Sequence, residues 1–88
     1  MEEYKERLVN EICRLKTRIE RLEKFIKTHG SSTGFDPIQL SLMKVQIEHM
    51  KNYFTVLFMR CQLAFDMDEF EELMKKLEYD TVKDKAAV

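Results

Sequence analysis

The sequence predicts an all-α protein: an antiparallel two-helix hairpin plus a short C-terminal helix, assembled as a homo-oligomer. Two stretches of apolar residues recur every three or four positions, which is the period of a helix that buries one face. A segment rich in Gly, Ser and Thr separates them, and the 88 residues contain only two Gly and one Pro. Because a β-sandwich needs many turns, so few turn-forming residues argue against an all-β fold.

Composition indicates one small folded domain. Hydrophobic residues make up 44% of the chain, which is too many for a disordered protein. We predict a single helical-hairpin domain with its C-terminal helix over residues 1–79 and a disordered tail over residues 80–88, where no apolar period is present. The net charge of −1 provides no general attraction to nucleic acid polymers or to anionic membranes.

No segment of the sequence resembles a membrane span or a secretory signal. The longest mostly apolar stretch, residues 53–59, is far shorter than the roughly 20 residues that cross a bilayer. The opening residues are acidic and lack an apolar core. We therefore expect a cytoplasmic protein in which Cys13 and Cys61 are reduced thiols.

The first helix is predicted over residues 2–29. Its apolar positions follow heptad steps of four and three, so one stripe faces a partner helix. Lys27 and His29 suit the negative end of the helix dipole, and Gly30 is the expected stop. The stripe comprises Leu8, Ile12, Leu15, Ile19, Leu22 and Ile26.

The second helix begins after the Gly- and Ser-rich loop. Asp36 is the expected N-cap, with Pro37 at the first helical position and Gln39 completing a capping box. Phe35 and Leu40 are spaced as a hydrophobic staple. The apolar stripe comprises Leu40, Met43, Ile47, Met50, Phe54, Leu57 and Cys61.

A third, short helix of about three turns is predicted after residue 65. Asp66 followed by Glu69 forms a second capping box. Its apolar stripe comprises Met67, Phe70, Leu73, Met74 and Leu77.

Residues 53–65 are apolar on all sides of the predicted second helix, so this stretch should be buried on all sides. One partner helix and a short tail helix do not cover it. We therefore predict a homo-oligomer that associates through this stretch, with Phe58 and Leu63 in the interface. The alternative is a three-helix monomer in which the C-terminal helix folds back over the extra stripe.

Arginines gather on one side of the first helix. They are Arg7, Arg14 and Arg21 at heptad position c and Arg18 at the adjacent position g. They repel one another unless an anion lies among them, and guanidinium groups bind phosphate with two parallel hydrogen bonds. The alternative is that acids in residues 66–85 of a neighbouring copy neutralise them. Composition alone slightly favours that salt-bridged arrangement.

Arg60 stands within the most apolar part of the second helix. Its guanidinium must extend to solvent or find an anion. In an antiparallel hairpin Arg60 lies beside the start of the first helix, so it could converge with Tyr4 and Arg7.

No pattern indicates catalysis or metal binding. The loop at residues 30–34 lacks the Lys-Ser/Thr ending of a P-loop, and it is interpreted as a flexible connector. The two His and two Cys residues are wrongly spaced for zinc, and no Ser or Cys nucleophile has a His and an acid at suitable spacing. We predict no catalytic residue, no metal and no cofactor.

Two runs of heptad-spaced residues carry a resemblance that covers residues 4–60. They comprise Tyr4, Arg7, Leu8, Glu11, Ile12, Leu15, Arg18, Ile19, Leu22, Phe25 and Ile26, then Leu40, Leu42, Met43, Gln46, Met50, Tyr53, Leu57 and Arg60. In these positions the chain resembles small helical-hairpin proteins of bacteriophages, including crAss-like phages. It is similar to the phage sponges that oppose CBASS and Thoeris immunity by sequestering cyclic oligonucleotides or cyclic ADP-ribose signals.

The resemblance implies a non-catalytic sponge in the host bacterial cytosol. It implies a homo-oligomer such as a hexamer, with pockets for a small anionic cyclic nucleotide where helices of different protomers meet, and no nucleic acid polymer or membrane as partner. The ligand-binding positions that carry over are Tyr4, Arg7, Arg18 and Arg60. The resemblance shifts the preference to an anion site over the salt-bridged arrangement, and it assigns no role to the residues from Asp66 onward.

Two other function classes stay open. A structural or adaptor coiled-coil oligomer would bind no nucleotide. A small all-α enzyme of the chorismate mutase type would use Arg and Lys to hold a dianionic substrate, but the Arg-x-x-Ile-Asp-type opening expected of it is not well matched.

Overall fold

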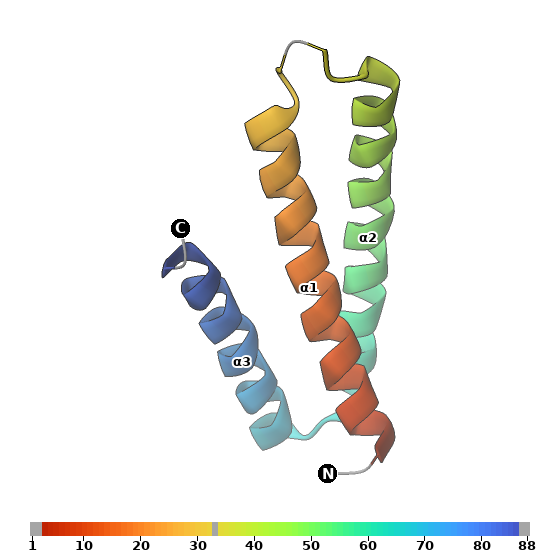
Figure 1. The fold of residues 1–88 in the computed structure, drawn as a ribbon. Helices are drawn as coiled ribbons and strands as arrows, with labels where there is room; N and C mark the ends of the chain where they lie inside the picture. Colours follow the sequence, from red (N-terminus) through yellow and green to blue (C-terminus); the bar gives the residue numbers. More distant parts are fainter. Residues whose placement is uncertain (1–2, 33, 87–88) are drawn as a thin grey trace.

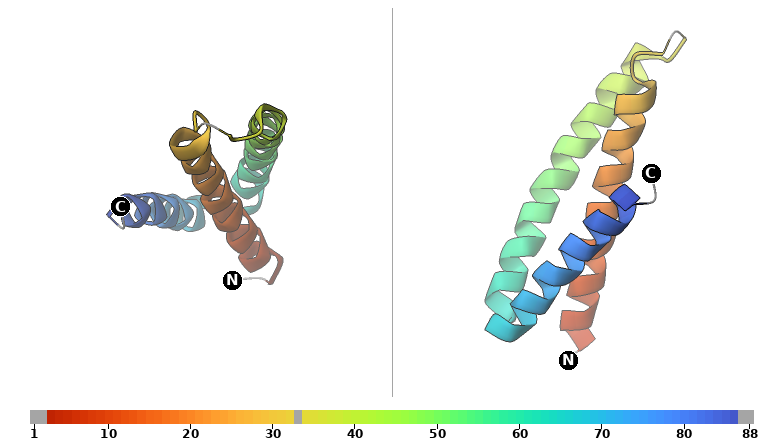
Figure 2. Two further views of the ribbon diagram at one scale, coloured as in Figure 1. Left: turned by 45° about the horizontal axis from the view of Figure 1, so that its top comes forward. Right: turned by 90° about the vertical axis from the view of Figure 1, so that its left-hand side faces the viewer.

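Three α-helices form the described part of the chain. The computed structural model describes residues 3–32 and 34–86, with the side chains of residues 3–32 and 34–78. The helices are α1 (Glu3–His29), α2 (Pro37–Ala64) and α3 (Met67–Ala86). Figure 1 shows α1 and α2 as an antiparallel hairpin, and Figure 2 shows α1 lying between α2 and α3. The predicted all-α fold with a helical hairpin is therefore confirmed.

The end of α1 depends on a close backbone approach. The N–H of Gly30 donates a hydrogen bond of 2.7 Å to the carbonyl oxygen of Ile26. A Cβ atom at Gly30 would lie 2.5 Å from that oxygen, which is too close for any larger residue without movement of the backbone. Glycine at this position therefore allows the chain to leave the helix.

Both later helices begin at capped N-termini. The Asp36 side chain accepts a hydrogen bond of 2.9 Å from the N–H of Ile38, the second residue of α2. We predicted a capping box, in which the N–H of Gln39, one residue later, would donate this bond. Both geometries are usual for an N-cap. At α3 the predicted box is confirmed, because Asp66 and Glu69 each accept a hydrogen bond from the other's backbone N–H, at 2.8 and 3.1 Å.

One apolar cluster holds the three helices together. Its buried members are Leu8, Ile12, Leu15, Ile19, Leu57, Cys61, Phe65, Leu73 and Leu77. Ile12, Leu57 and Cys61 are fully inaccessible to solvent. Burial of one large apolar side chain contributes about 1.5–3 kcal/mol, so a handful of these residues outweighs any surface ion pair.

The third helix is longer than the predicted three turns, because α3 continues to Ala86. The apolar period that the prediction used ends at Leu77, so the sequence carries no packing signal for the remaining turns. Residues 80–86 of the predicted disordered tail are helical, and residues 87–88 lie outside the described residues. The division into a domain and a tail at residue 79 stays a prediction.

The first turn of α3 attaches to both helices of the hairpin. The Nζ atom of Lys5 lies 3.1 Å from the Glu69 carboxylate, and the Phe70 ring packs edge-on against Phe58 with ring centroids 5.4 Å apart. Phe58, predicted to lie between copies, therefore packs within the single chain. However, α3 leaves one side of α2 uncovered, where Tyr53, Val56, Met59 and Leu63 are exposed.

No helix in the described ranges combines the length and the apolar character needed to cross a bilayer.

Removing the α3 capping box should destabilise the protein. We expect Asp66→Ala to lower the free energy of unfolding by about 1 kcal/mol, because one N-terminal N–H loses its acceptor. Glu69→Ala should lower it further, since the ion pair with Lys5 is lost as well. Thermal unfolding followed by circular dichroism measures both changes. Glu71→Ala is the control, because Glu71 pairs only on the exposed surface, with Lys75 at 3.7 Å. Equal effects of Glu69→Ala and Glu71→Ala would contradict the cap.

Cys61 should react slowly with alkylating reagents. Burial raises the pKa of the Cys61 thiol; nearby Arg60 opposes this rise and Cys13 adds to it. Because the thiolate is the reactive species, a raised pKa leaves less of it at pH 8. We expect iodoacetamide to modify Cys61 more slowly than free glutathione at pH 8, with the rate increasing as the pH rises. Peptide mass spectrometry measures the rate, and a rate equal to that of glutathione would contradict the burial.

Candidate functional site

Two adjoining grooves lie along one side of the α1–α2 hairpin, and Arg18 lines both of them. The first, of about 490 Å³, is lined by Arg18, Arg21, Leu22, Phe25, Met43, Gln46 and Met50. The second, of about 480 Å³, is lined by Arg7, Asn10, Glu11, Arg14, Leu15, Arg18 and Tyr53. Both volumes fall within the range of small-molecule sites. We call the two grooves together the arginine trough.

The trough follows from the register of the hairpin. The Tyr53 hydroxyl donates a hydrogen bond to the Glu11 carboxylate, which places these two residues opposite each other. Arg18 lies seven residues after Glu11 on α1, and Gln46 lies seven residues before Tyr53 on α2. These two residues again share a groove. Since seven residues are close to two turns, both helices present one flank along the whole trough.

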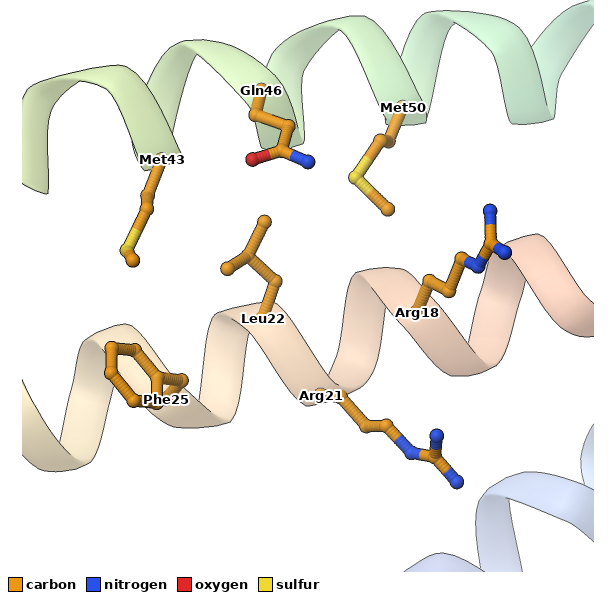
Figure 3. Close-up of a pocket in the computed structure, with 7 residues that line it drawn as sticks. All are labelled: Arg18, Arg21, Leu22, Phe25, Met43, Gln46 and Met50. Atoms are coloured by element: carbon orange, nitrogen blue, oxygen red, sulfur yellow. The ribbon is translucent and has the colours of Figure 1, made fainter. Parts of the chain in front are cut away.

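The floor of the first groove is apolar and its rim is charged. Figure 3 shows Leu22 of α1 pointing toward α2, with Gln46 and Met50 of α2 pointing toward α1. Arg21 points away from α2 at the edge of this arrangement. A ligand with an apolar ring and an anionic group could therefore contact the floor and the rim together.

The trough carries an excess of positive charge. Three arginines and one acid, Glu11, line the second groove, whereas two arginines and no acid line the first. All four arginine side chains are exposed. Arg14 and Arg18 are four residues apart, and Arg18 and Arg21 three, so neighbouring guanidinium groups repel one another. An anion bound between them would relieve this repulsion.

The acidic residues form their ion pairs with lysines. The pairs are Lys5–Glu69 at 3.1 Å, Lys16–Glu20 at 2.6 Å, Lys51–Glu23 at 3.1 Å and Lys75–Glu71 at 3.7 Å. Among the side chains that the structure describes, no arginine lies within ion-pair distance of a carboxylate. Within one chain, therefore, the described acids of α3 do not neutralise the arginines of α1.

Two of the four predicted site residues line the trough. Arg7 and Arg18 both line the second groove, but they are eleven residues apart, or about 16 Å along the helix. We expect them to contact different anionic groups of a ligand and not one shared phosphate. Tyr4 and Arg60 are exposed and line neither groove. The heptad register places them seven residues beyond Glu11 and Tyr53, at the open end of the same flank.

Several lining residues were not predicted as site residues. Tyr53 and Gln46 are seven residues apart on α2, and this spacing is the signal that could have identified them. Their position beside α1 depends on how the two helices align. The spacing within one helix does not reveal this alignment, because Glu11 and its partner Tyr53 are 42 positions apart in the sequence. The described side chains contain no group of three or more His, Cys, Asp or Glu residues that could hold a metal ion.

Comparison with known proteins identifies a family. A family model described as Sequestin matches residues 2–63. The matched segment contains every residue that lines the arginine trough and ends before α3 begins. No curated protein and no solved structure matches the chain.

Changing the charge of the second groove should change its affinity for a polyanion. Glu11→Gln removes the acid from this groove, so we expect tighter binding of inorganic tripolyphosphate, while Arg14→Gln should weaken it. Isothermal titration calorimetry at low salt measures both affinities. Lys24→Gln is the matched control, since it removes one α1 charge outside both grooves. If Lys24→Gln weakens binding as much as Arg14→Gln, only the net charge of the protein matters.

Proposed function

Since the chain belongs to the Sequestin family, we propose that it sequesters a small anionic nucleotide and releases it chemically unchanged. The family name describes a sequestering role, and the arginine trough provides a surface suited to it. One observation carries the proposal: among the side chains that the structure describes, the carboxylates form their ion pairs with lysines, and none lies within ion-pair distance of an arginine of the trough.

The trough matches the chemistry of a ligand that carries several phosphates and bases. Each charge-assisted hydrogen bond from an arginine to a phosphate contributes about 1.5–3 kcal/mol, and Arg also stacks on bases. Phe25 and Tyr53 add aromatic faces, and Leu22 and Met50 add an apolar floor. Arg7 and Arg21 are fourteen residues apart, so the trough extends for about 21 Å, which suits several separate anionic groups.

We propose a cyclic oligonucleotide or a cyclic ADP-ribose isomer as the ligand. Removal of such a signal in the cytosol of an infected bacterium would oppose CBASS or Thoeris immunity, as the resemblance to phage sponges implies. The proposed assembly is a homo-oligomer, since the exposed side of residues 53–65 needs cover. The proposal assigns the protein no catalytic step, no cofactor and no metal.

A ligand screen tests this function directly. Thermal-shift measurements against cyclic di- and trinucleotides and cyclic ADP-ribose isomers should find at least one compound that raises the melting temperature. Denaturation of the complex should then return that compound intact, as shown by mass spectrometry. An altered compound would favour an enzyme of the chorismate mutase type, and the absence of any binding would favour an adaptor coiled coil.

Variants of Arg18 test the assigned surface. Because Arg18 lines both grooves, Arg18→Ala should weaken binding of the ligand from the screen by roughly tenfold to a hundredfold. Arg18→Lys should restore part of the affinity, since an ammonium group keeps the charge but lacks the planar fork. Lys24→Ala should leave the affinity unchanged. Tyr4→Ala and Arg60→Ala should also weaken binding if the ligand extends to the open end of the hairpin. Equal affinities of wild type and Arg18→Ala would reject the site.

A further inference from the structure

The side of α2 that faces away from α1 carries a second heptad seam. Its eight members follow steps of four and three, and all eight are exposed. They are Ile38, Leu42, Val45, His49, Asn52, Val56, Met59 and Leu63. The six apolar members are 49–89% exposed, so the fold of the single chain leaves this seam without a partner. We call these eight residues the outer seam.

An exposed apolar stripe of this length is typical of an interface. The outer seam spans residues 38–63, and its two ends are about 37 Å apart along the helix. Repeated steps of four and three over more than three heptads are the pattern of a helix that packs against another helix. Large contiguous apolar patches on a folded protein mark interaction surfaces. A helix is therefore the expected occupant of the outer seam.

The outer seam is symmetric about its own centre, between Met50 and Lys51. When a second copy of α2 runs in the opposite direction about this point, each member of the outer seam lies opposite another member. The matched pairs are Ile38 with Leu63, Leu42 with Met59, Val45 with Val56, and His49 with Asn52. Alternating steps of four and three make the spacing of any such seam symmetric, so the residue types carry the argument: the two polar members match each other, and every apolar member matches an apolar one. A second copy in antiparallel orientation favours this match of residue types, because a twofold interface places the same residues on both sides.

We propose that two copies of the chain pair through their outer seams as an antiparallel coiled coil centred between residues 50 and 51. Each layer then joins a heptad position a of one copy to a position d of the other. The three outer layers on each side of the centre are apolar. The central layers join His49 to the partner's Asn52, two groups that can exchange a hydrogen bond. Polar residues at the centre of an otherwise apolar seam are a known means of fixing register.

The flanking positions agree with this pairing. Among the residues directly beside the outer seam, Glu48 and Arg60 carry charge. The register places Glu48 near the partner's Thr55, and Arg60 near the partner's Gln39. Among these flanking residues of α2, therefore, no like charges meet, and the opposed helix dipoles are favourable as well.

The partner copy would also border the arginine trough. Tyr53 and Gln46 line the two grooves and lie directly beside the outer seam. In the antiparallel register Tyr53 lies next to the partner's Gln46, so the second groove of one copy adjoins the first groove of the other. A ligand could then contact residues of both copies. The pairing itself depends on α2 alone and holds whether or not a nucleotide binds.

Charge substitutions in one layer test the pairing. Light scattering on the full chain should give an even-numbered assembly, in contrast to the 10.6 kDa of one copy. Val56→Glu should reduce this mass to half or less, with helicity by circular dichroism unchanged because Val56 is exposed. The double variant Val45→Glu with Val56→Lys should restore the mass of the assembly, since each layer that joins residue 45 to the partner's residue 56 then joins opposite charges.

Met67→Glu is the control for this test, because Met67 is an exposed apolar residue outside the outer seam. A monomeric wild type, or an assembly unaffected by Val56→Glu, would overturn the proposal.

Cysteine cross-linking tests the orientation. In the antiparallel pair, residue 42 lies beside the partner's residue 59 but about 25 Å from the partner's residue 42. Leu42→Cys and Met59→Cys variants should therefore form a disulfide between copies when mixed, and neither should do so alone, because a disulfide requires Cα atoms within about 7 Å. Wild type controls for Cys13 and Cys61, and mass spectrometry identifies the linked peptides. Cross-linking of Leu42→Cys to itself would show a parallel pair and overturn the register.

Discussion

The fold depends on the burial of one apolar stripe on α1. Leu8, Ile12, Leu15 and Ile19 belong to the same buried cluster as the contact residues of α2 and α3. Because α1 lies between the other two helices, this stripe is where both of them bury apolar surface. A domain of this size has a total stability of the order of 5–15 kcal/mol, so much of it must come from these contacts. The orientation of α1 is thereby fixed, and its arginines are left on the exposed side that lines the arginine trough.

The two sides of α2 lie in different surroundings. Residues such as Leu57 and Cys61 complete the core of the hairpin, while Val56 and Met59, their sequence neighbours, face solvent. One neighbouring helix cannot bury both sides of a helix that is apolar on both sides. The prediction that one partner helix and the C-terminal helix leave part of residues 53–65 exposed is therefore confirmed. It does not separate the part that α3 covers, such as Phe58, from the part that stays exposed.

Local signals in the sequence predicted the helices well, and contacts between helices were harder to predict. The bounds of α1 and the cap at Asp66 follow from heptad spacing and capping chemistry, which depend on residues a few positions apart. The length of α3 beyond Leu77 has no apolar period to indicate it. Arg7 and Arg18 were identified because one helix determines their common side. Tyr53 joins them through the pairing of two helices, which periodicity alone leaves undetermined.

The arginines of α1, which form no ion pair with a described carboxylate, also bear on the relation between the proposed function and stability. Arg14, Arg18 and Arg21 repel one another along a helix whose stability would rise if one of them were an acid or an alanine. Natural proteins retain such unfavourable groupings where a site needs them, so that the stability optimum and the functional optimum of a sequence differ. Under the proposed function, the residues that bind the ligand lie on the same helix that supplies the core. Selection for greater thermal tolerance would therefore tend to erode the trough first, while the buried stripe beside it stayed intact.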